Sequence, residues 1–233
     1  MVSKITTGYP TDEEGRPYKR RRYAPVLATV AVLAVLGVIV WSIVLTSDGE
    51  DSVPVSCNQP TPPSATETVA DGAAPPPPAP ALTRVPRDEM LDVAPAPLSS
   101  FQVRVLNASG ERGAARSVSE DLAAHGFTPA PDTPFADDTV YPDQDLDCVG
   151  QIRFGPAGRA AAAAAWLALP CAELIDDGRR GTQVDIALGV HHSAGELSQD
   201  AQAALEALRS ADPTNPETGA DPVLVKAVHD APC

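Results

Sequence analysis

The sequence predicts an α+β fold: a ferredoxin-like βαββαβ domain with additional C-terminal helices, preceded by one transmembrane helix and a Pro-rich stalk. Three observations support this prediction: an uncharged apolar run near the N-terminus, a Pro/Ala-rich tract after it, and alternating strand-like and helix-like patterns in the remainder. We therefore expect four segments, namely a basic tail at 1–23, a transmembrane helix at 24–45, a stalk at 46–97 and a folded domain at 98–233.

The apolar run predicts a membrane anchor. Residues 24–45 carry no charged side chain, and a helix of about 20 apolar residues crosses a hydrocarbon layer of roughly 30 Å. A cleaved signal peptide is the alternative, but its apolar core would be shorter and would end at a small-residue cleavage site. The basic cluster Lys19–Arg22 precedes the run, so we expect a signal anchor in the cell membrane with a cytoplasmic N-terminus and an extracytoplasmic C-terminal domain.

The tract after the anchor is rich in Pro, Ala, Ser and Thr, and it includes the sequence APPPPAPA at 74–81. Such a segment buries too little apolar surface to fold, and its prolines keep it extended. We expect a semi-rigid stalk, with a Pro-rich ligand for a partner domain as the alternative.

The domain opens with an alternating strand pattern at 101–106, followed by the turn NASGERG and a helix that Gly126 ends as a left-handed cap. A long Ala-rich helix begins after Gly158 and is ended by Pro170. The acidic, Pro-containing segment 129–147 is expected to be a loop. Further strands are expected at 127–128, 151–154 and 184–188, and further helices within 193–209 and 222–229.

All four cysteines, Cys57, Cys148, Cys171 and Cys233, follow the apolar run and would lie in an oxidising compartment, which predicts two disulfide bonds. A strand and the helix that returns from it bring their outer ends together. We therefore expect Cys148 to pair with Cys171, which leaves Cys57 for Cys233.

The chain carries a net charge of −14, and its basic excess is confined to the N-terminal tail, so we expect no nucleic-acid partner. Motifs of serine hydrolases, zinc proteases and P-loop enzymes are missing from the sequence, which predicts no catalytic residues, metal or cofactor. The triplet Asp143, Asp145 and Asp147 lacks the glycine and glutamate of a calcium loop, so we expect a solvated acidic loop, with weak divalent-cation binding as the alternative. His191 and His192 are neighbours whose side chains should face opposite ways, so they make a poor joint metal site.

The strand–turn–helix at 107–113 is the best candidate site. Backbone N–H groups at the start of the helix, with Arg112 beside them, could hold an anion. Alternatively, the short polar side chains bond to the backbone and the glycines permit positive φ, so that the turn is purely structural; we favour this interpretation. The residues concerned are Asn107, Ser109, Gly110, Arg112 and Gly113.

The stretch VRVLNASGERGAARSVSEDL at 103–122 resembles the opening motif of the LytR C-terminal (LytR_C) domain family. The stretch DCVGQIRFG at 147–155 and the C-terminal cysteine resemble actinobacterial envelope-integrity proteins. The resemblance implies a non-enzymatic single-pass protein that maintains the cell wall, with an envelope protein or a cell-wall polymer as partner. A glycan- or polymer-binding module that uses the turn, or an accessory factor to a cell-wall polymer ligase, is the alternative.

Overall fold

The structure is a computed structural model, and it describes residues 13–14, 23–46, 54–60, 82–215 and 218–233. The chain forms two compact units, residues 1–51 and residues 52–233, which are described separately below.

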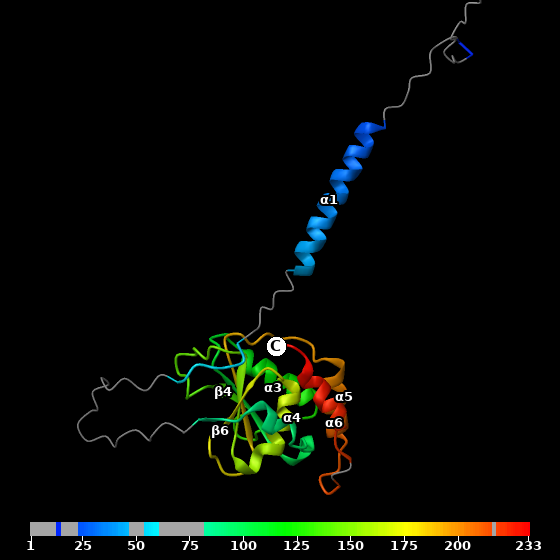
Figure 1. The fold of residues 1–233 in the computed structure, drawn as a ribbon. Coiled ribbons are helices and arrows are strands. Elements are labelled where there is room, and N and C mark those ends of the chain that lie inside the picture. Colours follow the sequence, from blue (N-terminus) through cyan, green and yellow to red (C-terminus); the bar gives the residue numbers. More distant parts are fainter. Residues whose placement is uncertain (1–12, 15–22, 47–53, 61–81, 216–217) are drawn as a thin grey trace, which may run out of the picture. The chain divides into compact units, whose positions relative to one another are not determined.

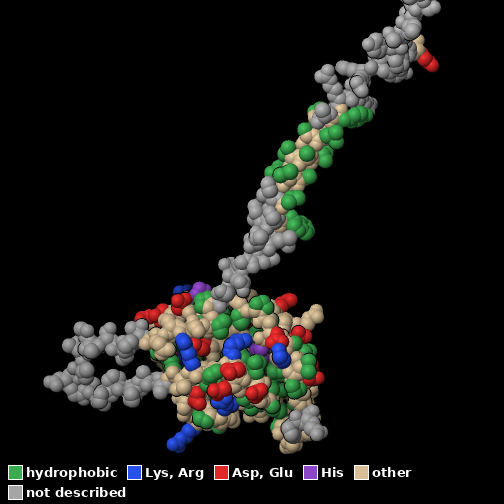
Figure 2. All heavy atoms as spheres, in the orientation of Figure 1, with side chains coloured by type: hydrophobic (Ala, Val, Ile, Leu, Met, Phe, Trp, Pro, Cys, Tyr) green, Lys and Arg blue, Asp and Glu red, His purple; other side chains and the backbone are tan. Residues whose placement is uncertain are grey.

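The first unit contains one long helix, α1 (Ala24–Thr46), which spans the predicted segment 24–45. Its described side chains, at 25–38 and 41, are exposed, and the large ones are apolar, including Trp41 at 70% exposure (Figure 2). None of the helices, judged on the described residues, has both the length and the apolarity that a membrane span requires. The transmembrane assignment therefore stays a prediction.

The second unit is built around a mixed sheet with strand order β1-β6-β5-β7-β2-β3 (Figure 1). A further strand, β4, pairs with the C-terminal half of β2 beyond the short β3. Strand β2 runs parallel to β3, β4 and β7, and β5 runs parallel to β6, whereas β5–β7 and β1–β6 are antiparallel. The bounds are β1 Thr83–Arg84, β2 Gln102–Asn107, β3 Thr128–Pro129, β4 Phe135–Asp137, β5 Gly150–Phe154, β6 Glu173–Asp176 and β7 Val184–Leu188.

The α+β class is confirmed, but the ferredoxin-like arrangement is not. A ferredoxin-like sheet would be four-stranded and antiparallel, whereas β2 lies parallel to both of its neighbours. The unpredicted strand β6 also enters the sheet beside β5. After a strand–helix–strand crossover the second strand runs in the same direction as the first, so the two can pair in parallel. The order of elements along the chain does not decide which strands become neighbours in the sheet.

The helices α2 (Arg87–Leu91), α3 (Ala114–Ala124), α4 (Arg159–Ala168), α5 (Gln199–Arg209) and α6 (Pro222–Asp230) all contribute to the main core. Helix α4 packs against β5 on one side and α5 on another, and α5 packs against α6 (Figure 1). Because α4 is buried on all sides, its run of small alanines lets the sheet and the outer helices approach closely. Helix α5 lies within the predicted range 193–209 and buries one face, formed by Ala201, Ala204, Leu205 and Leu208.

The opposite face of the sheet carries a second, smaller core. Side chains alternate along a strand, so Leu106 and Ala187 point away from the helices. They pack with Cys57, Tyr141 and Cys148, which come from segment 54–60 and from the loop before β5.

The same face carries a row of buried charges across three strands, where Arg104 and Arg153 both lie opposite Asp185. Arg153 is 2% exposed, and its guanidinium donates to the carboxylate of Asp138 at 2.7 Å. Asp185 pairs with Arg104 and, at 2.8 Å, with Arg179. Burial alone would raise the pKa of Asp185, but the two arginines outweigh it and lower that pKa. Charges at this depth are tolerated because each is paired.

Segments 54–60 and 82–97 belong to the folded unit, so the expected stalk at 46–97 is wrong for these residues. Met90 is 1% exposed within the main core, and Arg84 donates to the carbonyl of Cys57 at 2.6 Å. Asn58 bonds to the backbone of Asp145 and of Asp147. The remaining stalk residues, 47–53 and 61–81, lie outside the described part of the chain.

Two disulfide bonds are present, as expected, but their pairing differs from the prediction. Cys57 is bonded to Cys148 and Cys171 to Cys233, with Cα–Cα distances of 4.9 and 5.5 Å. The predicted Cys148–Cys171 pair is wrong because the two residues lie on opposite faces of the sheet. Cys148 sits in the smaller core, whereas Cys171 directly follows α4 on the helical side.

Candidate functional site

The turn between β2 and α3 is held by hydrogen bonds among its own residues. Asn107 is 6% exposed, and its Oδ1 accepts from the backbone N–H of Ser109 at 3.2 Å and from its hydroxyl at 2.8 Å. The Asn107 amide donates to the carbonyl of Glu111 at 3.0 Å, and the Ser109 hydroxyl accepts from the N–H of Glu111 at 3.2 Å. These side chains are thus engaged in shaping the turn.

The glycines of the turn have the expected positive φ, with values of 73° at Gly110 and 86° at Gly113. Arg112 is exposed and does not line the adjoining hollow of about 320 Å³ between the turn and β4. That hollow is lined instead by Arg116, which pairs with Glu120, and by Asp137. A carboxylate beside the start of α3 opposes the binding of an anion there.

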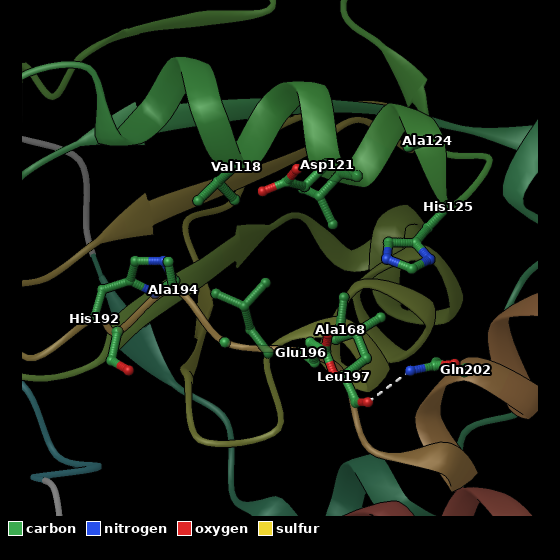
Figure 3. Close-up of a pocket in the computed structure, with 14 residues that line it drawn as sticks. Val118, Asp121, Ala124, His125, Ala168, His192, Ala194, Glu196, Leu197 and Gln202 are labelled. Atoms are coloured by element: carbon green, nitrogen blue, oxygen red, sulfur yellow. Dashed lines mark hydrogen bonds between the residues drawn. The ribbon is translucent and has the colours of Figure 1, made fainter.

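A larger groove of about 910 Å³ lies where α3, the end of α4, the loop at 192–197 and the start of α5 meet (Figure 3). Val118, Asp121 and His125 project from α3 toward the loop that carries His192 and Glu196. This groove could not be predicted from the sequence, because its lining comes from four distant segments that no local pattern links. Of the residues that line the groove, the sequence pattern had drawn attention to His192.

The two neighbouring histidines face different surroundings, as predicted. His191 is exposed, and its Nε2 lies 2.9 Å from a carboxylate oxygen of Asp147. His192 is half-buried in the groove, and its Nε2 has no hydrogen-bond partner. Burial lowers the pKa of His192, partly offset by the charge of Glu111, so its ring is neutral at neutral pH.

The three aspartates of the acidic loop, Asp143, Asp145 and Asp147, are exposed. No group of three or more His, Cys, Asp or Glu side chains that could hold a metal occurs among the residues the structure describes. The backbone of the loop instead holds segment 54–60, because Asn58 bonds to it twice and the Tyr141 hydroxyl donates to the Asn58 carbonyl at 2.6 Å.

An aromatic cluster joins α4 to α6. The ring of His229 stacks on Trp166 with centroids 3.7 Å apart, and the Arg87 guanidinium lies over the Trp166 ring at 4.6 Å. Burial, aided by the charge of Arg87, lowers the pKa of His229 to about 4. Trp166 is 1% exposed and belongs to the main core.

The folded unit is similar to a known family of cell-envelope domains. The model of the LytR_C family, described as "LytR cell envelope-related transcriptional attenuator", matches residues 100–191. The crystal structure of the soluble domain of a conserved hypothetical secreted protein from Mycobacterium marinum is 46% identical and superimposes with a TM-score of 0.58. The match covers 65% of this chain and 97% of that domain.

A full-length relative specifies the family further. The cell envelope integrity protein Cei of Mycobacterium tuberculosis is 39% identical over 233 residues, and the match covers the whole of both chains. The chain therefore belongs to the Cei family and contains a LytR_C domain.

Proposed function

We propose that this chain is a single-pass membrane protein whose extracytoplasmic domain supports the integrity of the cell envelope by binding another envelope component, without catalysing a reaction. The observation that carries the proposal is the similarity to Cei along the entire chain. A match that covers the whole of both chains supports the role in cell envelope integrity that the name of this relative states.

The topology is supported by the sequence of α1 and by the disulfides. Residues 24–45 are uncharged, and the basic cluster Lys19–Arg22 precedes them, which favours a cytoplasmic N-terminus. All four cysteines are in disulfides and follow the helix, which fits an oxidising exterior.

A binding role is favoured over catalysis because the buried side chains of Asn107 and Arg153 are held in hydrogen-bond networks. Asn107 organises its turn, and Arg153 is bound by Asp138 and Gln151. Groups tied into such networks position the backbone and are not free to react with a substrate. We propose that the turn at 107–113 likewise serves folding and not ligand binding.

The function is tested by complementation in a host strain that lacks its own copy of the gene. We expect wild-type protein to restore growth in sublethal detergent, and the soluble domain exported without α1 to restore it less well. Equal detergent sensitivity with and without the full-length protein would refute a role in envelope integrity.

The topology is tested with reporters fused after Thr46. We expect activity only from a reporter that functions outside the membrane. Replacing Lys19–Arg22 with neutral residues should reduce correct insertion, because basic residues near a span hold that end in the cytoplasm. Unchanged orientation and insertion in this variant would contradict the charge argument.

A further inference from the structure

The groove between α3, α4 and the 192–197 loop has the size of a ligand site. Its volume of about 910 Å³ lies toward the upper end of the range of roughly 300–1,000 Å³ that small-molecule pockets occupy. Its apolar lining comes from Val118, Leu122, Ala168, Leu169 and Leu197, which would cover the aliphatic part of a ligand (Figure 3).

The charge of the groove has one sign. Asp121 lies on the α3 side and Glu196 on the loop side, and both are exposed (Figure 3). Neither carboxylate has a hydrogen-bond or ion-pair partner within the described part of the chain. In contrast, the neighbouring carboxylate of Glu120 is bound by Arg116 at 2.8 Å.

No basic side chain compensates these two carboxylates. Neither Lys nor Arg occurs among the residues that line the groove, and the neutral ring of His192 adds no positive charge. The nearby Arg209 packs on Gly126 and lies 3.8 Å from Glu206. The negative dipole ends of α3 and α4 border the groove, whereas the start of α5 contributes one positive dipole end.

Polar groups in the groove could fix the orientation of a ligand. The unpartnered Nε2 of His192 is buried, and a ligand that reached it would supply the missing hydrogen bond. The Gln202 amide already donates to the carbonyl of Leu197 at 2.8 Å, which ties the loop to α5 and keeps that side of the groove in place.

We propose that this groove binds a peptide through a protonated primary amine, with Asp121 and Glu196 as its counter-charges and the apolar floor against its aliphatic part. The inference deepens the proposed function, on which it rests, by naming the chemistry of the envelope component. The amine can be a lysine-type side chain or the N-terminus of the peptide.

The test uses the full-length protein in detergent micelles and a fluorescent, blocked five-residue peptide with one central lysine, measured by anisotropy at low salt. A second peptide carries acetyl-lysine, and a third has a free N-terminus and no lysine. We expect acetylation to weaken binding about tenfold, because it removes the only charge that both carboxylates attract. Binding of the third peptide would identify the N-terminal amine as a further source and would also support the inference.

The matched variants are Asp121→Asn and Glu120→Gln, which remove one charge each from adjacent positions of α3. We expect Asp121→Asn and Glu196→Gln to weaken binding about threefold each, as for one exposed ion pair, and Glu120→Gln to leave it unchanged. Equal binding of the lysine and acetyl-lysine peptides, or equal effects of Asp121→Asn and Glu120→Gln, would overturn the inference. Either result leaves the complementation test of envelope integrity intact, so the two proposals can fail separately.

Discussion

At the scale of single residues, the turn at 107–113 was predictable because its chemistry is local. Asn and Ser bond to the nearby backbone, and glycine adopts positive φ, whatever the rest of the chain does. The cysteine pairing was not predictable in this way. It depends on which face of the sheet each cysteine occupies, and Cys57 reaches Cys148 across 91 residues of sequence.

The turn yields a prediction about Gly110, whose φ is 73°. Replacing Gly110 with Val should lower the free energy of unfolding by about 1–3 kcal/mol, because a β-branched residue is strained in the left-handed region. Asn tolerates that region, so Gly110→Asn is the matched control and should cost less. Urea unfolding of the full-length protein in micelles measures all of these variants.

The exposed Arg112 should behave differently from the glycine. We expect Arg112→Ala to change the free energy of unfolding by less than about 0.5 kcal/mol and to leave retention on isolated cell wall unchanged. If Arg112→Ala lost wall retention while Gly110→Asn kept it, the turn would be a ligand site after all. If Gly110→Val were as stable as Gly110→Asn, the strain argument would fail.

At the scale of elements, the helices α3 to α6 followed from their periodicity and caps. Asp221, for example, lies directly before Pro222 and caps α6, because its carboxylate accepts from the N–H of Val223 at 2.8 Å. The strand β6 was not predicted, because it is short and has an acidic residue at each end, Glu173 and Asp176. Glu173 is buried only because Arg84 and Gln151 bind it, and both partners are remote in sequence.

The stacking of α6 on α4 through His229 predicts a pH dependence. The pKa of His229 is lowered from 6.5 to about 4 in the folded protein. As pH falls below about 6.5, the unfolded chain gains a proton that the folded chain does not, so stability present above this pH is lost down to about pH 4. We expect a loss of about 1 kcal/mol, reduced from the full value because the ring is partly exposed.

The control for this prediction is His229→Phe, which keeps an aromatic ring against Trp166 and removes the titration. The difference in unfolding free energy between wild type and variant should shrink or reverse as pH falls from 6.5 to 4. His192 also has a lowered pKa, but it is common to both proteins and cancels. If the unfolding free energies of wild type and His229→Phe changed equally with pH, the pH dependence would not come from His229.

At the scale of the whole molecule, composition distinguished the apolar segment that forms α1 from the folded unit that follows it. Composition could not place the domain boundary, because segments 54–60 and 82–97 look like stalk in sequence. They join the fold through a disulfide, through contacts of Asn58 and through β1, all of which depend on residues about 90 positions away. The groove was unpredictable for the same reason.

The Cys57–Cys148 bond makes residues 58–147 part of a closed covalent ring that contains the whole Pro-rich segment 61–81. A single cut in that segment would therefore not shed the domain. With a site-specific endopeptidase sequence inserted at 61–81, we expect cleaved protein to remain one species on a non-reducing gel and to stay in the membrane fraction. Reductant should split it into two fragments, and a Cys57→Ser/Cys148→Ser variant should release the domain on cleavage alone. Release of the wild-type domain without reductant would refute the ring. With this bond intact, an envelope protein keeps its outer domain after a protease cuts once within 61–81.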